Sequence, residues 1–483
     1  MGKEVKIQFI YLCIGLTAFL YVLIRGFTVG VTYDEAWTIN GFAANNWLDI
    51  LNFTPCDANN HLLNTLLIKF FFLFRNHSLF VARLPNILAY LLFIYYGYKI
   101  ANHFLSPIIG LCCFLLLLLN PFLLDFFSLA RGYGLSLGFM MPSLYFTLNY
   151  LKSSTNTSYL TGAIGFAALS VLSNFSWLNY FMATVITITG VSLFQKDRLN
   201  LKKTIIVEIG ISLILLLLIY EPIRKLKKLG GFYYGGDKDF YHDTLISLSK
   251  YMFYNSEANP FIINLLNIFL FAFLFSIIAS FIYNRTVPST KNIFLYITLL
   301  CVLSTVLQHY LLGSRYLIDR TALFFYPLFI LTLCFSLNEI QYKYLTSISI
   351  SLITLAFSIN FINHANLYKT ALWYFDAHSK ETLETLNNIG EEQNKLIKID
   401  FSWPFSSSYD YYSQLKDYTY LEIVKSDNDR EELNPNADYY IYLNKSLEKV
   451  GYNKNNQKIL ALAKDTFMQY KNENIIIFRN LRK

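Results

Sequence analysis

Charged residues are scarce in this sequence. They make up 15% of its 483 residues, whereas an ordinary soluble domain carries about 25%. Hydrophobic residues supply 54%, and apolar runs of about 17 to 25 residues, each long enough to cross a bilayer, recur as far as about position 362. This composition excludes a soluble globular protein and predicts a protein that crosses the membrane many times.

Cysteine is scarce as well. Of the 6 cysteines, only Cys56 falls in a polar loop and the others lie in apolar runs, which excludes a disulfide framework. The net charge of +8 is small for this length, and the sequence has no polybasic tail, aromatic stacking motif or zinc-ligand spacing, which excludes nucleic acid as a partner. A small-residue cleavage site is missing after the first apolar run, so we expect a retained helix and not a signal peptide.

The apolar runs predict about eleven transmembrane helices. Their predicted bounds are 7–29, 82–101, 107–125, 132–151, 158–173, 177–195, 204–220, 261–283, 292–312, 321–338 and 345–362. If Lys3 and Lys6 are cytoplasmic, most basic turns fall inside, as the excess of Lys and Arg in cytoplasmic loops requires. The basic run Arg224–Lys228, which we place in an outer loop, opposes this parity. The parity puts everything after position 362 on the outer face of the cytoplasmic membrane.

The character of the sequence changes after the last predicted helix. In residues 364–483 the apolar runs shrink to KLIKID, LEIV, YYIYL and NIIIF, and helical patterns such as SKETLETLNNIGEEQNK separate them. Strands that alternate with helices predict a small α/β domain. We therefore expect a transmembrane domain over 1–363 and an extracytoplasmic α/β domain over 364–483. The second has no evident catalytic cluster, and we interpret it as a lid or docking module.

The first outer loop, residues 30–81, carries two adjacent acids. Apolar residues recur with the helical period from Ala36 to Ile50, and HLLNTLLIKFFFLF is a second short apolar stretch, so we expect helices that lie in the interface. Thr32 to Glu35 reads T-x-x-E, a capping box in which Glu35 bonds back to the N-cap amide. A partly desolvated Asp34 is also suited to accept a proton from a hydroxyl or amide group beside a lipid phosphate.

Four short motifs occur in a telling order over residues 7–340. They are TYDEAWT after the first predicted helix, then NNHLLNTLL, ARLPN and SLARGYGLSL. Together they resemble bacterial relatives of the GT-C glycosyltransferases, a superfamily that includes protein O-mannosyltransferases and the lipid A aminoarabinose transferase. The resemblance implies a GT-C-like transmembrane domain that moves a sugar from a polyprenyl-phosphate donor to a lipid, glycan or protein acceptor, with inversion. It also implies that Asp34 is the general base and that Glu35 supports it.

Transfer from a polyprenyl phosphate leaves a lipid phosphate dianion, which needs cationic hydrogen-bond donors. Arg131 in LARGYG matches the family position at the start of a predicted helix, where anions bind readily. We expect Arg131 and Tyr133 to bind substrate. The structural alternative for Arg131 is an interfacial side chain that reaches up to water. Arg315 and Arg320 in GSRYLIDR also suit a phosphate, as they suit lipid headgroups.

Three further residues are expected to bind substrate. Arg83 in ARLPN either does so or fixes the start of the second span. His61 and Asn64 lie three residues apart on one helix face and are expected to orient Asp34 or the sugar. Relatives often have His-Pro-Pro here, where this chain has leucines after His61, and a solvated loop histidine is the alternative. The run Arg224–Lys228 either gathers the donor phosphate or is a solvated basic face.

The sequence leaves two other classes of function open. A transporter or flippase of lipid-linked glycans should show repeats, broken spans or ionisable residues at mid-membrane, and a glycan polymerase or ligase should concentrate Arg and His in one late loop. The spacing D-x-D at Asp237 and Asp239 is one that binds divalent cations in some sugar transferases. Relatives with a D-E loop generally need no metal, so we predict neither a metal ion nor another cofactor.

Overall fold

The chain forms two compact units. The computed structural model describes residues 3–74, 78–152, 156–194, 198–254, 292–424, 436–443, 466–471 and 475–480, together with positions 260, 263, 264, 267 and 434. One unit, here called the membrane unit, comprises Met1–Phe27 and Phe42–Ala365, and the other, the C-terminal unit, comprises Thr28–Gly41 and Asn366–Lys483. The predicted transmembrane domain, 1–363, includes residues 28–41. By their contacts they belong with the C-terminal unit.

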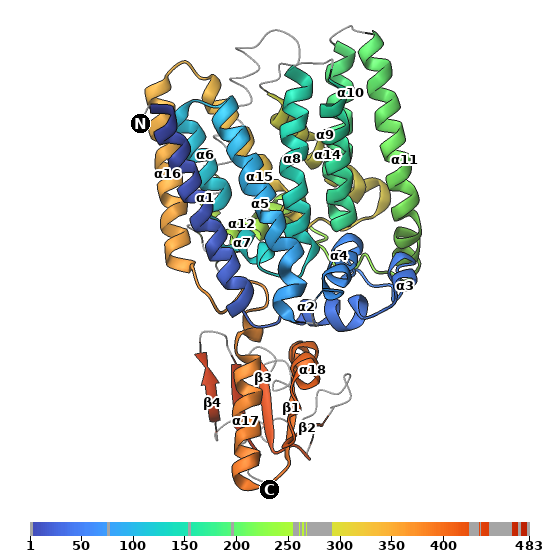
Figure 1. Cartoon of the computed structure of the whole chain (residues 1–483), viewed down its shortest axis with the longest axis vertical. Coiled ribbons are helices and arrows are strands. Elements are labelled where there is room, and N and C mark those ends of the chain that lie inside the picture. Colours follow the sequence, from blue (N-terminus) through green and yellow to red (C-terminus); the bar gives the residue numbers. More distant parts are fainter. Residues whose placement is uncertain are drawn as a thin grey trace. The chain divides into compact units, whose positions relative to one another are not determined.

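The membrane unit is helical (Figure 1). Its helices are α1 (Lys3–Thr28), α3 (Trp47–Leu51), α4 (Leu62–Phe72), α5 (Leu79–Phe104), α6 (Pro107–Leu118), α7 (Pro121–Phe127), α8 (Gly132–Lys152), α9 (Thr157–Ser173), α10 (Leu178–Phe194), α11 (Arg198–Lys228), α12 (Ser247–Met252), α14 (Ile293–Leu312), α15 (Phe325–Glu339) and α16 (Lys343–His364). Each predicted span on described residues overlaps one of these helices, or two in the case of 107–125. Except for positions 263, 264 and 267, the predicted span 261–283 lies outside the described residues.

Length and hydropathy qualify 7 of the described helices as membrane spans, or up to 8 if a bent pair is counted as one span. The protein is therefore a multi-pass membrane protein, and the count of eleven stays a prediction. The short helix α4 is apolar but is not long enough to qualify, in line with our expectation that HLLNTLLIKFFFLF does not span.

The predicted span 107–125 is not a single straight helix. α6 and α7 meet at a bend of 61°. Asn120 caps α7 by accepting a hydrogen bond from the Leu123 amide at 3.1 Å, and Pro121 occupies the first turn. A residue before proline avoids the helical conformation, whereas proline itself is well suited to the first position of a helix. The dipeptide Asn-Pro therefore ends one helix and begins the next.

Burial separates central from peripheral spans. Within the most apolar window of each helix, 72% of α15 is buried, against 17% of α16 and 22% of α1. Phe9, Leu12 and Phe27 of α1 are 57%, 65% and 63% exposed, and in a membrane protein such a surface faces lipid. Sequence could not distinguish these helices, because lipid-facing and core-facing positions are equally apolar.

We expected the basic run Arg224–Lys228 in a loop, but it lies in a helix. α11 continues to Lys228, so these residues form its last turns. Positively charged side chains there interact favourably with the negative end of the helix dipole. Arg224 pairs with Glu221, and Lys225 Nζ donates to the Asn52 carbonyl at 2.5 Å. The run therefore ties the end of α11 to the loop after α3.

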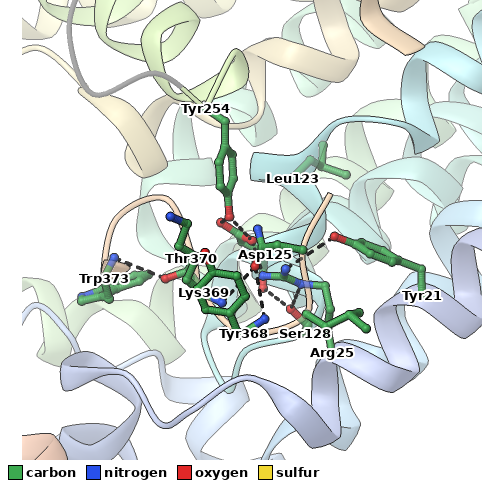
Figure 2. A network of polar contacts seen from close by, with 12 residues as sticks. Tyr21, Arg25, Leu123, Asp125, Ser128, Tyr254, Tyr368, Lys369, Thr370 and Trp373 are labelled. Atoms are coloured by element: carbon green, nitrogen blue, oxygen red, sulfur yellow. Dashed lines mark hydrogen bonds and ion pairs between the residues drawn. The ribbon is translucent and has the colours of Figure 1, made fainter. Parts of the chain in front are cut away.

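An ion pair lies inside the membrane unit, where α1 meets α7 (Figure 2). Arg25 Nη2 lies 2.5 Å from Asp125 Oδ1, and the two side chains are 1% and 2% exposed. The Tyr254 hydroxyl lies 2.9 Å from each Asp125 oxygen and shares its hydrogen between them, and Arg25 Nε donates to Ser128 Oγ at 3.4 Å. Charges at such depth are costly unless they are paired and hydrogen-bonded. This network therefore fixes α1 against the turn that leads from α7 to α8.

The C-terminal unit is built on a mixed sheet (Figure 1). Its strands are β1 (Ile397–Phe401), β2 (Leu421–Ile423), β3 (Tyr439–Leu443), β4 (Thr466–Tyr470) and β5 (Ile475–Arg479), in the order β2-β1-β3-β5-β4. β1 is parallel to β2 and β3, whereas β5 is antiparallel to β3 and β4. The unit also contains the helices α2 (Tyr33–Trp37), α17 (Ser379–Gln393) and α18 (Ser406–Leu415).

The strands KLIKID, LEIV, YYIYL and NIIIF and the helix SKETLETLNNIGEEQNK are confirmed. β3 is buried at every position, as its uninterrupted apolar sequence predicts for a central strand. β4 and α18 were not predicted. β4 is an edge strand whose residues are mostly exposed, and α18 is rich in Ser and Tyr, so neither has a strong apolar pattern.

We expect Asp125→Ala to lower the free energy of unfolding by about 3–5 kcal/mol, because it removes the carboxylate that balances the buried Arg25 charge. The measurement is the unfolding midpoint of the purified protein in detergent. Glu221→Ala is the matched control, since the Arg224–Glu221 pair has side chains that are 53% and 41% exposed, and its midpoint should not change. Equal losses in both variants would contradict the prediction.

Candidate functional site

The predicted acidic pair lies in the C-terminal unit, at the start of α2. Thr32 is the N-cap residue: its Oγ1 accepts from the Glu35 amide at 3.4 Å, and Glu35 Oε2 accepts from the Thr32 amide at 3.1 Å. The capping box predicted from T-x-x-E is therefore confirmed. Glu35 is fully buried, and its carboxylate holds the helix start.

Asp34 is only 4% exposed. Its backbone carbonyl accepts a hydrogen bond from Thr38 Oγ1 at 2.8 Å, at the point where α2 continues into the π-helical turn η1 (Thr38–Ala43). A carboxylate on a short, capped helix has little freedom to move. Such restriction is what a general base requires, because it must lie within hydrogen-bond reach of the proton that it removes.

Residues far along the chain hold the backbone just before Asp34. The Val31 amide donates to the Tyr412 hydroxyl at 2.9 Å, and the Tyr33 amide donates to Asp376 Oδ2 at 2.6 Å. Tyr412 lies on α18, and Asp376 lies in the turn η6 (Tyr374–His378). Within the C-terminal unit, residues after position 366 therefore supply hydrogen-bond acceptors for the segment that carries the acidic pair.

Sequence reasoning missed Asp376, since it found no catalytic cluster after position 364. Asp376 is 2% exposed. Burial, together with the charges of Asp34 and Glu35, raises the pKa of Asp376 well above its ordinary value of 3.8, although hydrogen bonds from Ser408 and the Tyr33 amide oppose this. The available signal was an acid inside the aromatic stretch WYFDAH, which favours a buried carboxyl group.

In the membrane unit, His61 and Tyr133 meet. His61 is the N-cap residue of α4, and its ring lies edge-on to Tyr133 of α8 with 5.0 Å between centroids. Tyr133 in turn lies 6.2 Å from the Trp177 ring. Burial, followed by the charges of Arg131 and Arg320, lowers the pKa of His61 well below its ordinary value of 6.5. The imidazole is therefore neutral at physiological pH.

Two polar atoms in this aromatic cluster are buried and unpaired. Neither His61 Nε2 nor Trp177 Nε1 has a hydrogen-bond partner in the described part of the chain, and the two residues are 5% and 0% exposed. Buried polar groups in proteins are nearly always hydrogen-bonded, to protein, water or ligand. The cluster therefore offers one indole donor and one imidazole nitrogen to a polar ligand.

Arg131 is fully buried and hydrogen-bonded to the loop before α4. Its Nη1 and Nη2 donate to the Asn59 backbone oxygen and Oδ1 at 3.1 and 3.0 Å. The alternative of an interfacial arginine that reaches water is wrong, because the side chain has no exposed surface. The next residue must be glycine: a Cβ at Gly132 would lie 2.0 Å from the Ser173 carbonyl oxygen and 2.8 Å from His61 Cβ.

Asn64 and Arg83 make structural hydrogen bonds. Asn64 Nδ2 donates to the Ala130 carbonyl at 3.2 Å, and its Oδ1 accepts from Asn86 Nδ2 at 2.8 Å. Arg83 Nη1 donates to the Gly26 carbonyl at 3.2 Å. These bonds satisfy both buried side chains: Asn64 supports Ala130, the residue before Arg131, and Arg83 supports the end of α1. Their expected contact with substrate stays a prediction.

Arg320 belongs to a compact cluster with Tyr234 and Asp319. Its guanidinium carbon lies 4.4 Å from the Tyr234 ring centroid, and its Nη1 donates to the Tyr234 hydroxyl at 3.1 Å. That hydroxyl donates to Asp319 Oδ2 at 2.5 Å. Burial raises the pKa of Tyr234, a change that Arg320 opposes and Asp319 reinforces. Asp319 has a φ of +38°, a strained backbone conformation typical of functional sites.

Arg315 and the D-x-D acids are engaged separately. Arg315 is 44% exposed and its Nε lies 3.3 Å from Asp237 Oδ1. Asp239 caps the turn η3 (Phe240–Ile246) by accepting from the His242 amide at 2.7 Å, and this bond is the main reason that the pKa of Asp239 is lowered. Across the described residues, no group of three or more His, Cys, Asp or Glu side chains is arranged to hold a metal ion.

Comparison with solved structures shows the fold. ArnT from Cupriavidus metallidurans in the apo state is 10% identical in sequence, with a TM-score of 0.54 over 99% of both chains. The same protein bound to undecaprenyl phosphate gives 9% identity and a TM-score of 0.51 over 98% of both chains. The Archaeoglobus fulgidus oligosaccharyltransferase, in complex with Zn and sulfate, gives 12% identity and a TM-score of 0.50 over 96% of this chain and 73% of its own.

These similarities extend over nearly the whole chain, so the GT-C fold predicted from the four motifs is confirmed. No protein-family model and no curated protein sequence matches the chain. At identities of 9 to 12%, the likeness shows the fold alone.

The neutral His61 makes stability depend on pH. Because the pKa of His61 is lower in the folded state, the unfolded state binds a proton first as the pH falls below about 6.5. The free energy of unfolding then falls by up to about 1.4 kcal/mol per pH unit. Above pH 6.5 the effect vanishes. We expect His61→Asn, which places a favourable N-cap residue at the start of α4, to unfold with a weaker pH dependence between pH 6.5 and 5.5 than the wild type.

Thermal unfolding of the detergent-solubilised protein at pH 7.5, 6.5 and 5.5 measures this difference. His103→Asn, which replaces an exposed histidine near the end of α5, is the matched control and should keep the wild-type pH dependence. Identical pH dependence in the His61 variant and the wild type would show that His61 is not held neutral by the fold.

Proposed function

We propose that the protein is an integral membrane glycosyltransferase that moves a sugar from a polyprenyl-phosphate donor to an acceptor on the outer face of the membrane. The GT-C fold supports this proposal, since one structure that shares it is an ArnT bound to undecaprenyl phosphate. The observation that carries the proposal is the capped, buried acid pair. Glu35 is engaged in the capping box, and Asp34, 4% exposed, takes the role of general base.

The proposed reaction is an inverting displacement. A hydroxyl or amide group of a lipid, glycan or protein acceptor attacks the anomeric carbon and forms the new glycosidic bond. The bond from that carbon to the phosphate oxygen breaks, and its electron pair leaves with the polyprenyl phosphate. Asp34 accepts the proton that the acceptor loses. General-base catalysis of this kind typically raises the reaction rate by a factor of about 10² to 10⁴.

The leaving phosphate requires a positive charge where its own charge develops. We assign this contact to Arg320, because its side chain is only partly buried and Tyr234 holds the guanidinium by stacking and by a hydrogen bond. Arg131 is fully buried and bound to Asn59, so in this proposal it contributes charge without direct contact. The Trp177 indole and the neutral His61 then hydrogen-bond to sugar hydroxyls.

An acceptor that arrives from outside the cell requires the C-terminal unit to face outward. We expect a membrane-impermeant maleimide to label Ser413→Cys, on the exposed end of α18, in intact cells in which Cys56 is replaced by serine. The matched control is Gln341→Cys, an exposed residue between α15 and α16, which should be labelled only after lysis. The reverse pattern would overturn the outward orientation.

Asp34→Asn tests the base. Asparagine keeps the size of the side chain but does not accept a proton, so we expect the turnover number to fall by about 10² to 10⁴ while the affinity for the donor is unchanged. The measurement is transfer of radiolabelled sugar from polyprenyl-phosphate donors in reconstituted membranes. A variant that transfers at the wild-type rate would leave the capping box as the whole explanation of the acid pair.

Two variants control this experiment. Glu35→Gln should cost about 1 kcal/mol of stability and far less rate than Asp34→Asn, because the amide oxygen still accepts the Thr32 amide hydrogen bond. Arg320→Ala should raise the KM for the donor, since a hydrogen bond to a charged group is worth about 1.5–3 kcal/mol. An unchanged donor KM would remove Arg320 from the phosphate contact without affecting the assignment of Asp34.

A further inference from the structure

The acid-bearing segment is fixed by its backbone. Residues 28–41 group with the C-terminal unit, and hydrogen bonds at 2.9 and 2.6 Å anchor the amides of Val31 and Tyr33, on either side of the N-cap residue. The Tyr33 ring packs on Trp403 with 5.0 Å between centroids. Asp376 accepts the shorter of these hydrogen bonds, from the residue that immediately precedes Asp34.

Asp376 lies in surroundings that disfavour a negative charge. It is 2% exposed, and α2 places the carboxyl groups of Asp34 and Glu35 near it. α18 contributes the Ser408 hydroxyl, whose Oγ lies 2.7 Å from Asp376 Oδ1, and the buried phenol of Tyr409. Both charged neighbours have the same sign as an ionised Asp376. Desolvation and like charge therefore act together to raise the pKa of Asp376.

The Ser408 hydroxyl lies between Asp376 and a backbone carbonyl. Ser408 Oγ lies 3.0 Å from the Phe405 carbonyl oxygen as well as 2.7 Å from Asp376 Oδ1. A hydroxyl has a single hydrogen to donate, and the Phe405 carbonyl can only accept. Ser408 therefore shares its hydrogen between the two oxygens, and a protonated Asp376 would be able to complete this pair by donating to Ser408 Oγ. In either protonation state, Oδ2 accepts the hydrogen bond from the Tyr33 amide.

We infer that Asp376 is a positioning residue for the general base: through the Tyr33 amide it fixes where Asp34 stands, without adding a negative charge beside it. This inference rests on the proposed function, in which Asp34 accepts the acceptor's proton. An ionised Asp376 would make Asp34 harder to ionise, whereas a neutral acid supplies the same hydrogen bond without that effect. The C-terminal unit then acts as the support of the catalytic base, beyond the lid or docking module that its sequence predicted.

Paired variants of Asp376 test the inference. In Asp376→Asn the amide oxygen accepts from Tyr33 and the amide nitrogen donates to Ser408, so we expect a turnover number within about twofold of wild type. Asp376→Ala removes the acceptor, and displacement of Asp34 by about 1 Å should lower the turnover number 10- to 100-fold, with the donor KM within about twofold. Asp417→Ala, at an exposed acid beyond α18, is the control and should behave as wild type.

Two kinetic outcomes would overturn the inference. If Asp376→Asn loses as much turnover as Asp376→Ala, the residue acts as an ionised carboxylate. If Asp376→Ala keeps the wild-type turnover number, the hydrogen bond to Tyr33 does not position the base.

Amide hydrogen exchange separates this inference from the proposed function. Measured by mass spectrometry on the full-length protein, exchange in a peptide that covers residues 31–35 should speed up in Asp376→Ala and stay as in wild type in Asp376→Asn and Asp417→Ala. The result requires no enzymatic activity. If wild-type protein transfers no sugar, the proposed function fails while the exchange data still decide whether Asp376 holds the segment. Unchanged exchange in Asp376→Ala would refute the positioning role even if transfer is observed.

Discussion

The position of the acidic pair at the start of α2 depends on two hydrogen bonds. They run from the Val31 amide to Tyr412 and from the Tyr33 amide to Asp376. α2 has only 5 residues, and an isolated helix of that length is unstable in water even with a good cap. The capping box at Thr32 and Glu35 therefore needs tertiary support. The turn η6 and α18 provide it, and the position of Asp34 follows from theirs.

Burial away from water determines how the membrane unit uses its arginines. Arg25, Arg83 and Arg131 are each fully or almost fully buried, and each donates to a carbonyl, a hydroxyl or a carboxylate. In a low-dielectric interior such bonds are what makes the charge tolerable. These arginines join helices and loops, whereas Arg320 is only partly buried and lies over the Tyr234 ring.

Local sequence patterns predicted the features that local interactions produce. Apolar run length predicted the described spans, T-x-x-E predicted the capping box, and short apolar runs predicted most strands. The bend at Asn120, the burial of Arg131 and the role of Asp376 were not predicted, for different reasons. A proline inside an apolar run does not reveal the angle of a bend. The partner of Asp376 lies 343 residues away, and contacts across that separation leave no periodicity in a single sequence.

The order of the chain has a consequence for synthesis. Tyr33 leaves the ribosome 343 residues before Asp376, which at about 5–20 residues per second corresponds to roughly 17 to 70 s. Throughout that interval α2 and its acids exist without the acceptors that later hold them, although the neighbouring spans are already available for insertion. The segment therefore reaches its final arrangement only when nearly the entire polypeptide has been made, so an incompletely translated chain carries the acids but not their support.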